Sequence, residues 1–144
     1  MEDYATEEKI SFKGKKIFVV EDDRFLHRLL MDEMRQLGAE VFSSFEGNST
    51  IESIRKEKPD IIVLDIILPG MDGFTVLEKL KADTELKHIP VIILTNLGQE
   101  DDIKKGTALG AEDFLIKANF TLDEITQKVS RVLKKREQKQ KNLY

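Results

Sequence analysis

The residues of this chain that could do chemistry stand at the ends of short apolar runs. Four such runs, residues 17–20, 61–64, 91–94 and 114–116, each stop at a polar side chain. In chain order, the residues that follow these runs are Glu21, Asp22 and Asp23, then Asp65, then Thr95, and then Lys117. Short apolar runs that alternate with helix-length segments are typical of buried parallel strands, which all end at one edge of their sheet. The sequence therefore predicts a crevice that gathers carboxylates, one hydroxyl and one ammonium group.

The carboxylates of this crevice are suited to a hard divalent cation. Like charges at a buried strand end repel each other unless a cation compensates them, so Glu21 and Asp22 require a partner. Mg²⁺ takes oxygen ligands, usually one or two carboxylates together with water and phosphate oxygens. Asp65 would add a carboxylate from the neighbouring strand. Asp23 is expected instead to cap the helix that follows it.

Asp65 also has the chemistry of a phosphoryl acceptor. Its carboxylate can attack phosphorus and form an acyl phosphate once a metal ion and a cation neutralise the phosphoryl oxygens. Lys117 carries a compact charge on a flexible stem that can reach such a group. Thr95 offers one hydroxyl donor to a phosphoryl oxygen. A lysine or threonine at a strand end is uninformative alone, but these positions together predict phosphoryl chemistry.

Five strands and five helices are expected to position these residues. The predicted strands cover residues 15–20, 40–45, 61–64, 91–94 and 114–117, and the predicted helices cover residues 25–37, 49–58, 74–80, 99–109 and 122–133. The apolar stripe of the first helix consists of Phe25, Leu26, Leu29, Leu30, Met34 and Leu37. The alternation specifies a doubly wound α/β fold, in which right-handed crossovers place helices on both faces of a parallel sheet. The helix at 99–109 is weakly apolar and is expected to be the least firmly held.

Length and composition limit the class of protein. The 144 residues are enough for one domain, and 40% hydrophobic and 35% charged residues fit a soluble globular protein. The sequence has no apolar stretch of membrane-spanning length, no secretory signal and no cysteine, which fits a cytoplasmic protein. The net charge of −4 gives no reason to expect nucleic-acid binding. We expect a polar leader over residues 1–13, a folded domain over residues 14–137 and a charged tail over residues 138–144.

Four motifs together resemble the receiver domain of two-component response regulators. They are Val19-Val20-Glu21-Asp22-Asp23, Leu64-Asp65-Ile66-Ile67-Leu68-Pro69-Gly70-Met71-Asp72-Gly73, Leu94-Thr95-Asn96, and Gly110-Ala111-Glu112-Asp113-Phe114-Leu115-Ile116-Lys117. The similarity covers about residues 15–136. It implies a flavodoxin-like fold, with a five-stranded parallel sheet in the order 2-1-3-4-5 and helices on both faces.

The resemblance also implies a phosphorylation site with a metal ion. Asp65 would be the phosphorylated aspartate. The metal ion, Mg²⁺ or Mn²⁺, would be held by Asp22, Asp65 and the backbone carbonyl of Ile67. Glu21 would act on it largely through water.

The other implied residues belong to a switch. Lys117 would pair with the phosphoryl group, the Thr95 hydroxyl would move toward it, and the Phe114 ring would follow into the vacated space. The chain would be a single-domain response regulator, and would be no enzyme beyond assisting its own phosphorylation and dephosphorylation. A histidine kinase or histidine phosphotransfer protein would be the donor. The signal would pass to a downstream protein through the helix at 99–109, the strand ending at Lys117 and the last helix, or through a homodimer formed on phosphorylation.

Several residues depart from the pattern of the family or refine it. Ala118 follows the conserved lysine where most receivers have proline, and Asn96 stands where alanine or serine is usual. Phe114 replaces the commoner tyrosine. Ile67 and Leu97 would flank the path of an attacking water and cannot orient it by hydrogen bonding, so we expect slow self-dephosphorylation.

Three alternatives have different sequence requirements. An aspartate-dependent phosphatase would want a second acid two residues past Asp65, where Ile67 stands. A flavin-binding relative of flavodoxin would want glycine or hydroxyl residues after the first strand, where residues 21–23 would repel phosphate. A degenerate receiver acting only as a scaffold is disfavoured by the full set of acceptor and metal residues, but Ala118 keeps it open.

Overall fold

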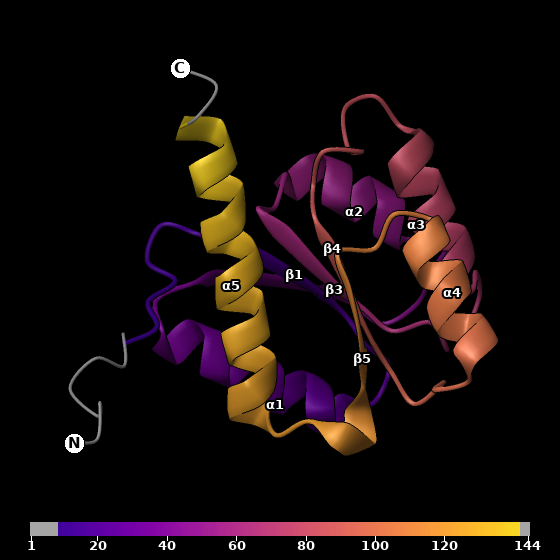
Figure 1. The fold of residues 1–144 in the computed structure, drawn as a ribbon, viewed down its shortest axis with the longest axis horizontal. Helices are drawn as coiled ribbons and strands as arrows, with labels where there is room; N and C mark the ends of the chain where they lie inside the picture. Colours follow the sequence, from indigo (N-terminus) through magenta and orange to yellow (C-terminus); the bar gives the residue numbers. More distant parts are fainter. Residues whose placement is uncertain (1–8, 142–144) are drawn as a thin grey trace.

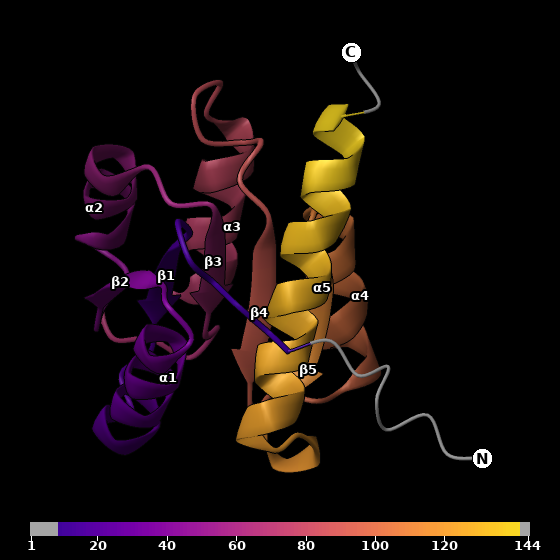
Figure 2. The same cartoon turned by 90° about the vertical axis from the view of Figure 1, so that its left-hand side faces the viewer.

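Residues 9–141, which the computed structural model describes, form one parallel sheet with helices on both faces. The strands are β1 (Lys16–Val20), β2 (Glu40–Ser44), β3 (Ile61–Leu64), β4 (Val91–Thr95) and β5 (Asp113–Ile116). The helices are α1 (Arg24–Gln36), α2 (Thr50–Glu57), α3 (Gly73–Ala82), α4 (Glu100–Ala108) and α5 (Leu122–Lys141), with a short 3-10 turn, η2, over Lys117–Asn119. The sheet order is β2-β1-β3-β4-β5, which Figure 2 shows from left to right. The predicted doubly wound α/β fold and its strand order are confirmed.

Two hydrophobic cores lie on opposite faces of this sheet. α1 and α5 pack on one face, and α2, α3 and α4 lie on the other (Figure 1). Alternate residues of a strand enter different cores, so that Ile17 and Val19 contact one core while Phe18 and Val20 contact the other. Burial on both faces explains why the strands are continuous apolar runs rather than alternating ones.

The register of the sheet brings the carboxyl ends of the central strands level with each other. Val20 is the partner of Leu64 across β1 and β3, and Thr95 is the partner of Ile116 across β4 and β5. The backbone N–H of Asp65 continues the pairing by donating to the Val20 carbonyl at 2.9 Å. The residues that follow these strands therefore meet at one edge of the sheet.

The apolar stripe predicted for α1 is wrong at two positions. Leu30, Met31 and Met34 are buried, but Phe25 is 73% exposed and Leu29 is 39% exposed. Phe25 and Leu29 are four positions apart and therefore share one side of the helix, which is turned away from the buried face formed by Leu30, Met31 and Met34. In each case the next residue in the sequence packs inward instead.

The folded part of the chain begins earlier than residue 14. Phe12 is 1% exposed within the core of α1 and α5, and its backbone N–H donates to the Leu37 carbonyl at 2.7 Å. Ile10 packs against the same core. The predicted leader over residues 1–13 is therefore wrong over residues 10–13. Lys9 is exposed, and residues 1–8 lie outside the described residues.

The last helix runs further than the predicted domain boundary. α5 continues to Lys141, past residue 137, because its lysine, glutamine and glutamate residues are good helix formers and its cations lie near the negative end of the helix dipole. Lys15 forms an ion pair with Glu137, which ties this extension to the domain. The predicted tail is therefore helical over residues 138–141, and residues 142–144 lie outside the described part. Among residues 9–141, no helix has the length and apolar character needed to cross a membrane.

α4 has few core contacts, as its sequence predicted. Gly106 is its only buried residue. A Cβ atom at this position would lie 2.8 Å from Ile93 Cδ1 and 2.9 Å from Phe114 Cδ2, so glycine allows α4 to lie directly on β4 and β5. Lys105 adds a contact to α3, with its Nζ 4.6 Å from the centre of the Phe74 ring.

Candidate functional site

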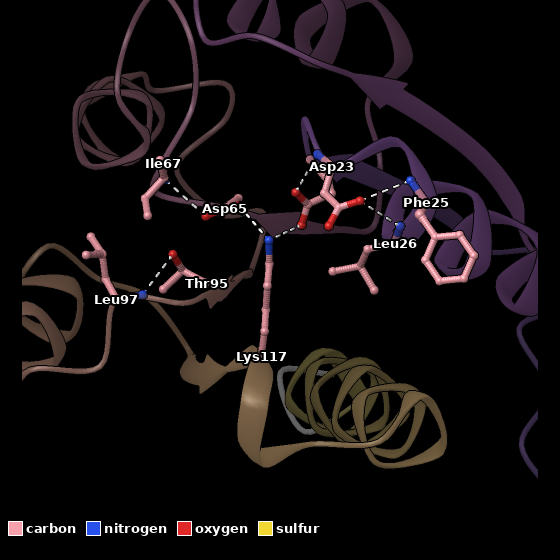
Figure 3. A network of polar contacts seen from close by, with 9 residues as sticks. Asp23, Phe25, Leu26, Asp65, Ile67, Thr95, Leu97 and Lys117 are labelled. Carbon is pink, nitrogen blue, oxygen red and sulfur yellow. Dashed lines mark hydrogen bonds and ion pairs between the residues drawn. The ribbon is translucent and has the colours of Figure 1, made fainter.

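A lysine joins two buried carboxylates at the carboxyl edge of the sheet (Figure 3). Lys117 Nζ, which follows β5, lies 2.7 Å from Asp65 Oδ2 and 2.7 Å from Glu21 Oε1. Asp65 follows β3 and Glu21 follows β1. The predicted convergence of residues from separate strands is present in the structure.

The surroundings of this ion-pair triad change its acid–base properties. Glu21 is 2% exposed and Asp65 is 4% exposed. Burial raises the pKa of Glu21 to about 7, although hydrogen bonds from Lys117 and from the Asp23 backbone oppose this rise. Burial also opposes the charged form of Lys117, but its hydrogen bonds to Asp65 and Glu21 outweigh burial and raise the pKa of the ammonium. Lys117 is therefore held in its charged form between the two carboxylates.

Backbone amides hold the remaining oxygen of each carboxylate. Asp65 Oδ1 accepts a hydrogen bond from the Ile67 N–H at 3.0 Å, and Glu21 Oε2 accepts one from the Asp23 N–H at 3.0 Å. Each acid thus binds an amide two residues further along its own chain segment and the lysine from another segment. We did not predict these amides, although an acid followed by a turn is a known pattern for such local hydrogen bonds.

Three carboxylates lie close enough to share one metal ion. Glu21, Asp22 and Asp65 can each offer an oxygen atom, and these atoms lie within 4.8 Å of one another. Asp22 is exposed, which leaves one side of the cluster open to solvent. An all-oxygen donor set that is partly open to water fits Mg²⁺ or Mn²⁺. Glu21 was expected to act on the metal ion through water. In this structure it also forms a direct ion pair with Lys117, which was not expected.

Asp23 caps α1, as predicted. Its side chain accepts hydrogen bonds from the N–H groups of Phe25 at 3.0 Å and Leu26 at 3.2 Å. This cap fixes the start of α1 directly after the acid pair, so the helix and Glu21-Asp22 keep a constant relation to each other.

The two predicted switch residues lie on the α4 side of the sheet. Thr95 is fully buried at the end of β4, and its hydroxyl oxygen accepts a hydrogen bond from the Leu97 N–H at 3.4 Å. Phe114 is partly buried, lies opposite Ile93 in the register and packs against the core beneath α4. Since Thr95 is opposite Ile116, Phe114 is one pleat away from it on the same face.

The residues expected to influence access to Asp65 are arranged around it. Ile67 is 52% exposed and Leu97 is half-buried, and both are visible beside Asp65 and Thr95 in Figure 3. Asn96 is exposed at the same edge. The peptide bond between Lys117 and Ala118 is trans, and η2 begins at Lys117.

Comparison with known proteins gives one consistent family. The family model for the response regulator receiver domain matches residues 17–130. The chain is 41% identical to the response regulator PleD of Caulobacter vibrioides over 102 residues, which are 71% of this chain and 22% of PleD. The chain therefore spans only about a fifth of the length of that relative.

Solved structures show the same likeness over most of the chain. The phosphorylated cyanobacterial phytochrome response regulator RcpA matches with a TM-score of 0.71 and 33% identity, covering 82% of this chain and 90% of RcpA. The Mn²⁺-bound form of response regulator Rcp1 matches with a TM-score of 0.71 and 28% identity, covering 82% of this chain and 91% of Rcp1. This chain belongs to the receiver domain family of two-component response regulators, whose members share a phosphorylation switch.

Proposed function

We propose that Asp65 is the phosphoryl acceptor of this receiver domain. The observation that carries the proposal is the Lys117 ammonium, which lies 2.7 Å from an oxygen of Asp65 inside a cluster of three carboxylates. A cation next to an acidic nucleophile can stabilise a phosphoryl group transferred to that nucleophile. Asp65 follows β3, a central strand that lies in the sheet between β1, which Glu21 and Asp22 follow, and β5, which Lys117 follows.

The proposed metal site uses Asp22, Asp65 and the backbone carbonyl of Ile67, with Glu21 acting through water. Support comes from the oxygen atoms of the three acids, which lie within 4.8 Å of one another, and from the Mn²⁺-bound form of Rcp1. A bound Mg²⁺ or Mn²⁺ would neutralise charge on the phosphoryl oxygens. It would also relieve the repulsion between Glu21 and Asp65.

Phosphoryl transfer then requires three actions from the side chains of the chain. A carboxylate oxygen of Asp65 attacks phosphorus, an O–P bond forms, and the P–N bond to the donor histidine breaks, with its electron pair leaving on the imidazole nitrogen. Lys117 exchanges its contact with the Asp65 carboxylate for one with a phosphoryl oxygen. The Thr95 hydroxyl donates to another phosphoryl oxygen once it turns away from the Leu97 N–H.

The proposed output is a change in the α4-β5-α5 surface. When the Thr95 side chain moves toward the phosphoryl group, it leaves space on the face where Phe114 lies. A Cβ atom on Gly106 would lie 2.9 Å from Phe114 Cδ2, so the ring lies directly beneath α4, and its movement would change how α4 packs on the sheet. α4 is suited to this because Gly106 is its only buried residue.

The partners in this proposal are a phosphohistidine donor and a downstream protein. The donor is a histidine kinase or a histidine phosphotransfer protein, and the downstream protein binds the α4-β5-α5 surface, or a second copy of this chain does so after phosphorylation. We propose a cytoplasmic location and no membrane or nucleic-acid contact for the receiver domain. We also propose that it is a switch and no turnover enzyme, because Ile67 stands where a phosphatase of this type would carry a second acid.

Mass spectrometry after incubation with a small acyl phosphate and Mg²⁺ tests the proposal. We expect one phosphoryl group on the wild-type protein, and none in Asp65→Asn or without Mg²⁺. Asp101→Asn, which changes an exposed aspartate of α4, serves as the matched control and should be modified normally. Modification of Asp65→Asn would contradict the assignment, unmodified wild type would favour the scaffold, and continuous phosphate release from esters would favour an enzyme.

A further inference from the structure

The turn between β2 and α2, residues 44–50, is held together by buried hydroxyl groups. The Thr50 hydroxyl donates to Ser44 Oγ at 2.8 Å and approaches the Glu46 carbonyl at 2.6 Å. Ser44 Oγ in turn donates to the Glu46 carbonyl at 2.9 Å. Thr50 is fully buried and Ser44 is 6% exposed, so water does not compete for these bonds. The turn is therefore a rigid element.

This rigid turn contacts both halves of the acidic site. On one side, the Glu21 N–H donates to the Ser44 carbonyl at 3.2 Å. On the other side, the Gly47 N–H donates to the Pro69 carbonyl at 3.1 Å. Pro69 belongs to the loop between β3 and α3, which also carries Ile67. The turn therefore bridges the segment of the acid pair and the loop that follows Asp65.

The contact with the second loop leaves no space for a side chain at residue 47. A Cβ atom on Gly47 would overlap the backbone carbonyl oxygen of Met71, and would lie 2.7 Å from both the carbonyl carbon and the Cβ of Met71. The obstacle is mostly backbone, so it cannot be relieved by rotation of a flexible side chain. Any larger residue must push the β3–α3 loop away from the turn.

We propose that Gly47 is a positioning residue for the metal site, a role that rests on the function proposed above. By holding Pro69 and Met71 against the turn, Gly47 sets the distance between the Glu21-Asp22 pair and the Ile67 carbonyl. The metal ion needs oxygen atoms from both segments at once, so its affinity depends on this spacing. Gly47 itself touches neither the metal nor the phosphoryl group.

Mn²⁺ affinity of Gly47→Ala, measured by electron paramagnetic resonance of the free ion, tests this role. We expect the Kd of Gly47→Ala to rise about tenfold or more relative to wild type. Gly14→Ala is the matched control, because Gly14 also lies in a turn and a Cβ atom there would meet nothing within 4 Å. Its φ of 79° makes alanine unfavourable, so the control loses some stability but should keep the wild-type Kd.

Phosphorylation kinetics separate positioning of the metal from damage to the fold. We expect Gly47→Ala to need more Mg²⁺ for half-maximal phosphorylation and to approach the wild-type rate when Mg²⁺ is saturating, because Asp65 and Lys117 are unchanged. If circular dichroism shows that Gly47→Ala does not fold, Thr50→Val decides instead. It loosens the turn without a steric overlap, and its Kd for Mn²⁺ should rise about threefold.

Two different results would overturn the inference, and they are distinguishable. A folded Gly47→Ala protein with the wild-type Kd would refute the positioning role and leave the proposed function intact. Wild-type protein that binds no Mn²⁺ would refute the proposed metal site, and the positioning role with it.

Discussion

Removal of the Lys117 ammonium should strongly destabilise the protein when no divalent cation is present. Lys117→Met keeps a side chain of similar length but removes the charge. It leaves Glu21 and Asp65, which are 2% and 4% exposed, without their shared counter-charge. The mutation therefore creates two buried carboxylates that face each other.

The size of the effect follows from the distances. At 2.7 Å and an effective dielectric constant of about 20, each contact contributes about 6 kcal/mol of Coulomb attraction before the cost of burial is subtracted. Removing one partner of a buried ion pair usually costs about 3–5 kcal/mol, which is a large part of the stability of a domain of this size. If the proposed metal site binds Mg²⁺, the ion should restore part of this loss, because it would bind the folded protein and replace the missing positive charge.

Urea unfolding followed by circular dichroism, at about pH 8 and with or without Mg²⁺, measures both effects. At this pH most of the wild-type protein has Glu21, with its pKa of about 7, ionised. Loss of Lys117 removes a hydrogen bond and a charge that lower this pKa, so part of the cost in Lys117→Met is uptake of a proton by Glu21. A Mg²⁺ concentration ten times the Kd of the wild-type site should raise the wild-type free energy of unfolding by about 1.4 kcal/mol. We expect Mg²⁺ to stabilise Lys117→Met by more than this amount.

Lys104→Met, which breaks an exposed ion pair with Glu100, should lose less than about 1 kcal/mol and respond to Mg²⁺ like wild type. The reasoning would be refuted if Lys117→Met lost no more free energy of unfolding than Lys104→Met. It would also be refuted if Mg²⁺ stabilised all three proteins equally.

Three further measurements test other parts of the structure. Ile67→Asn should lose its phosphoryl group several times faster than wild type, because asparagine can orient the attacking water, and slower loss measured by mass spectrometry would contradict this. Phe12→Ala should lower the free energy of unfolding in urea by about 3–5 kcal/mol, whereas Phe25→Ala on the surface should change it by less than about 0.5 kcal/mol; equal losses would exclude Phe12 from the core. Burial and the nearby Arg24 lower the pKa of His27, so the folded protein favours the neutral ring and loses stability as pH falls from about 6.5 through the lowered pKa. A pKa of His27 at or above 6.5, measured by NMR titration of the folded protein, would contradict this direction.

The sheet and the meeting point of the acids could be predicted because both depend on local sequence. Continuous apolar runs specify strands that are buried on both faces, and the first polar residue after each run marks the edge. Asp65 and Lys117 are 52 positions apart in the chain, yet the parallel arrangement alone brings them to one edge. The resemblance of the motifs then supplied the order of the strands.

Other features depend on contacts that no local pattern contains. Phe12 stands alone between polar residues, so no period marks it as part of the core, and only tertiary packing reveals it. In α1, Phe25 and Leu26 are equally apolar, and the orientation of the helix decides which one is buried. The choice of Glu21 as the second partner of Lys117 depends on side-chain conformations across three strands. The close approach of Gly47 to Met71 likewise depends on two loops that are distant in sequence.

The shallow seating of α4 has a consequence for the energy scale of signalling. Raising the population of a minor conformation from 1% to 99% requires about 5.5 kcal/mol of free energy that favours this conformation. Hydrogen bonds to a charged group contribute about 1.5–3 kcal/mol each, so two or three new bonds to a phosphoryl group cover that amount. Moving a helix that is anchored by large buried side chains would require more free energy, because those side chains would lose their packing. With glycine as the one buried residue of α4, phosphorylation of Asp65 as proposed would supply free energy of the size needed to exchange the dominant population of the domain.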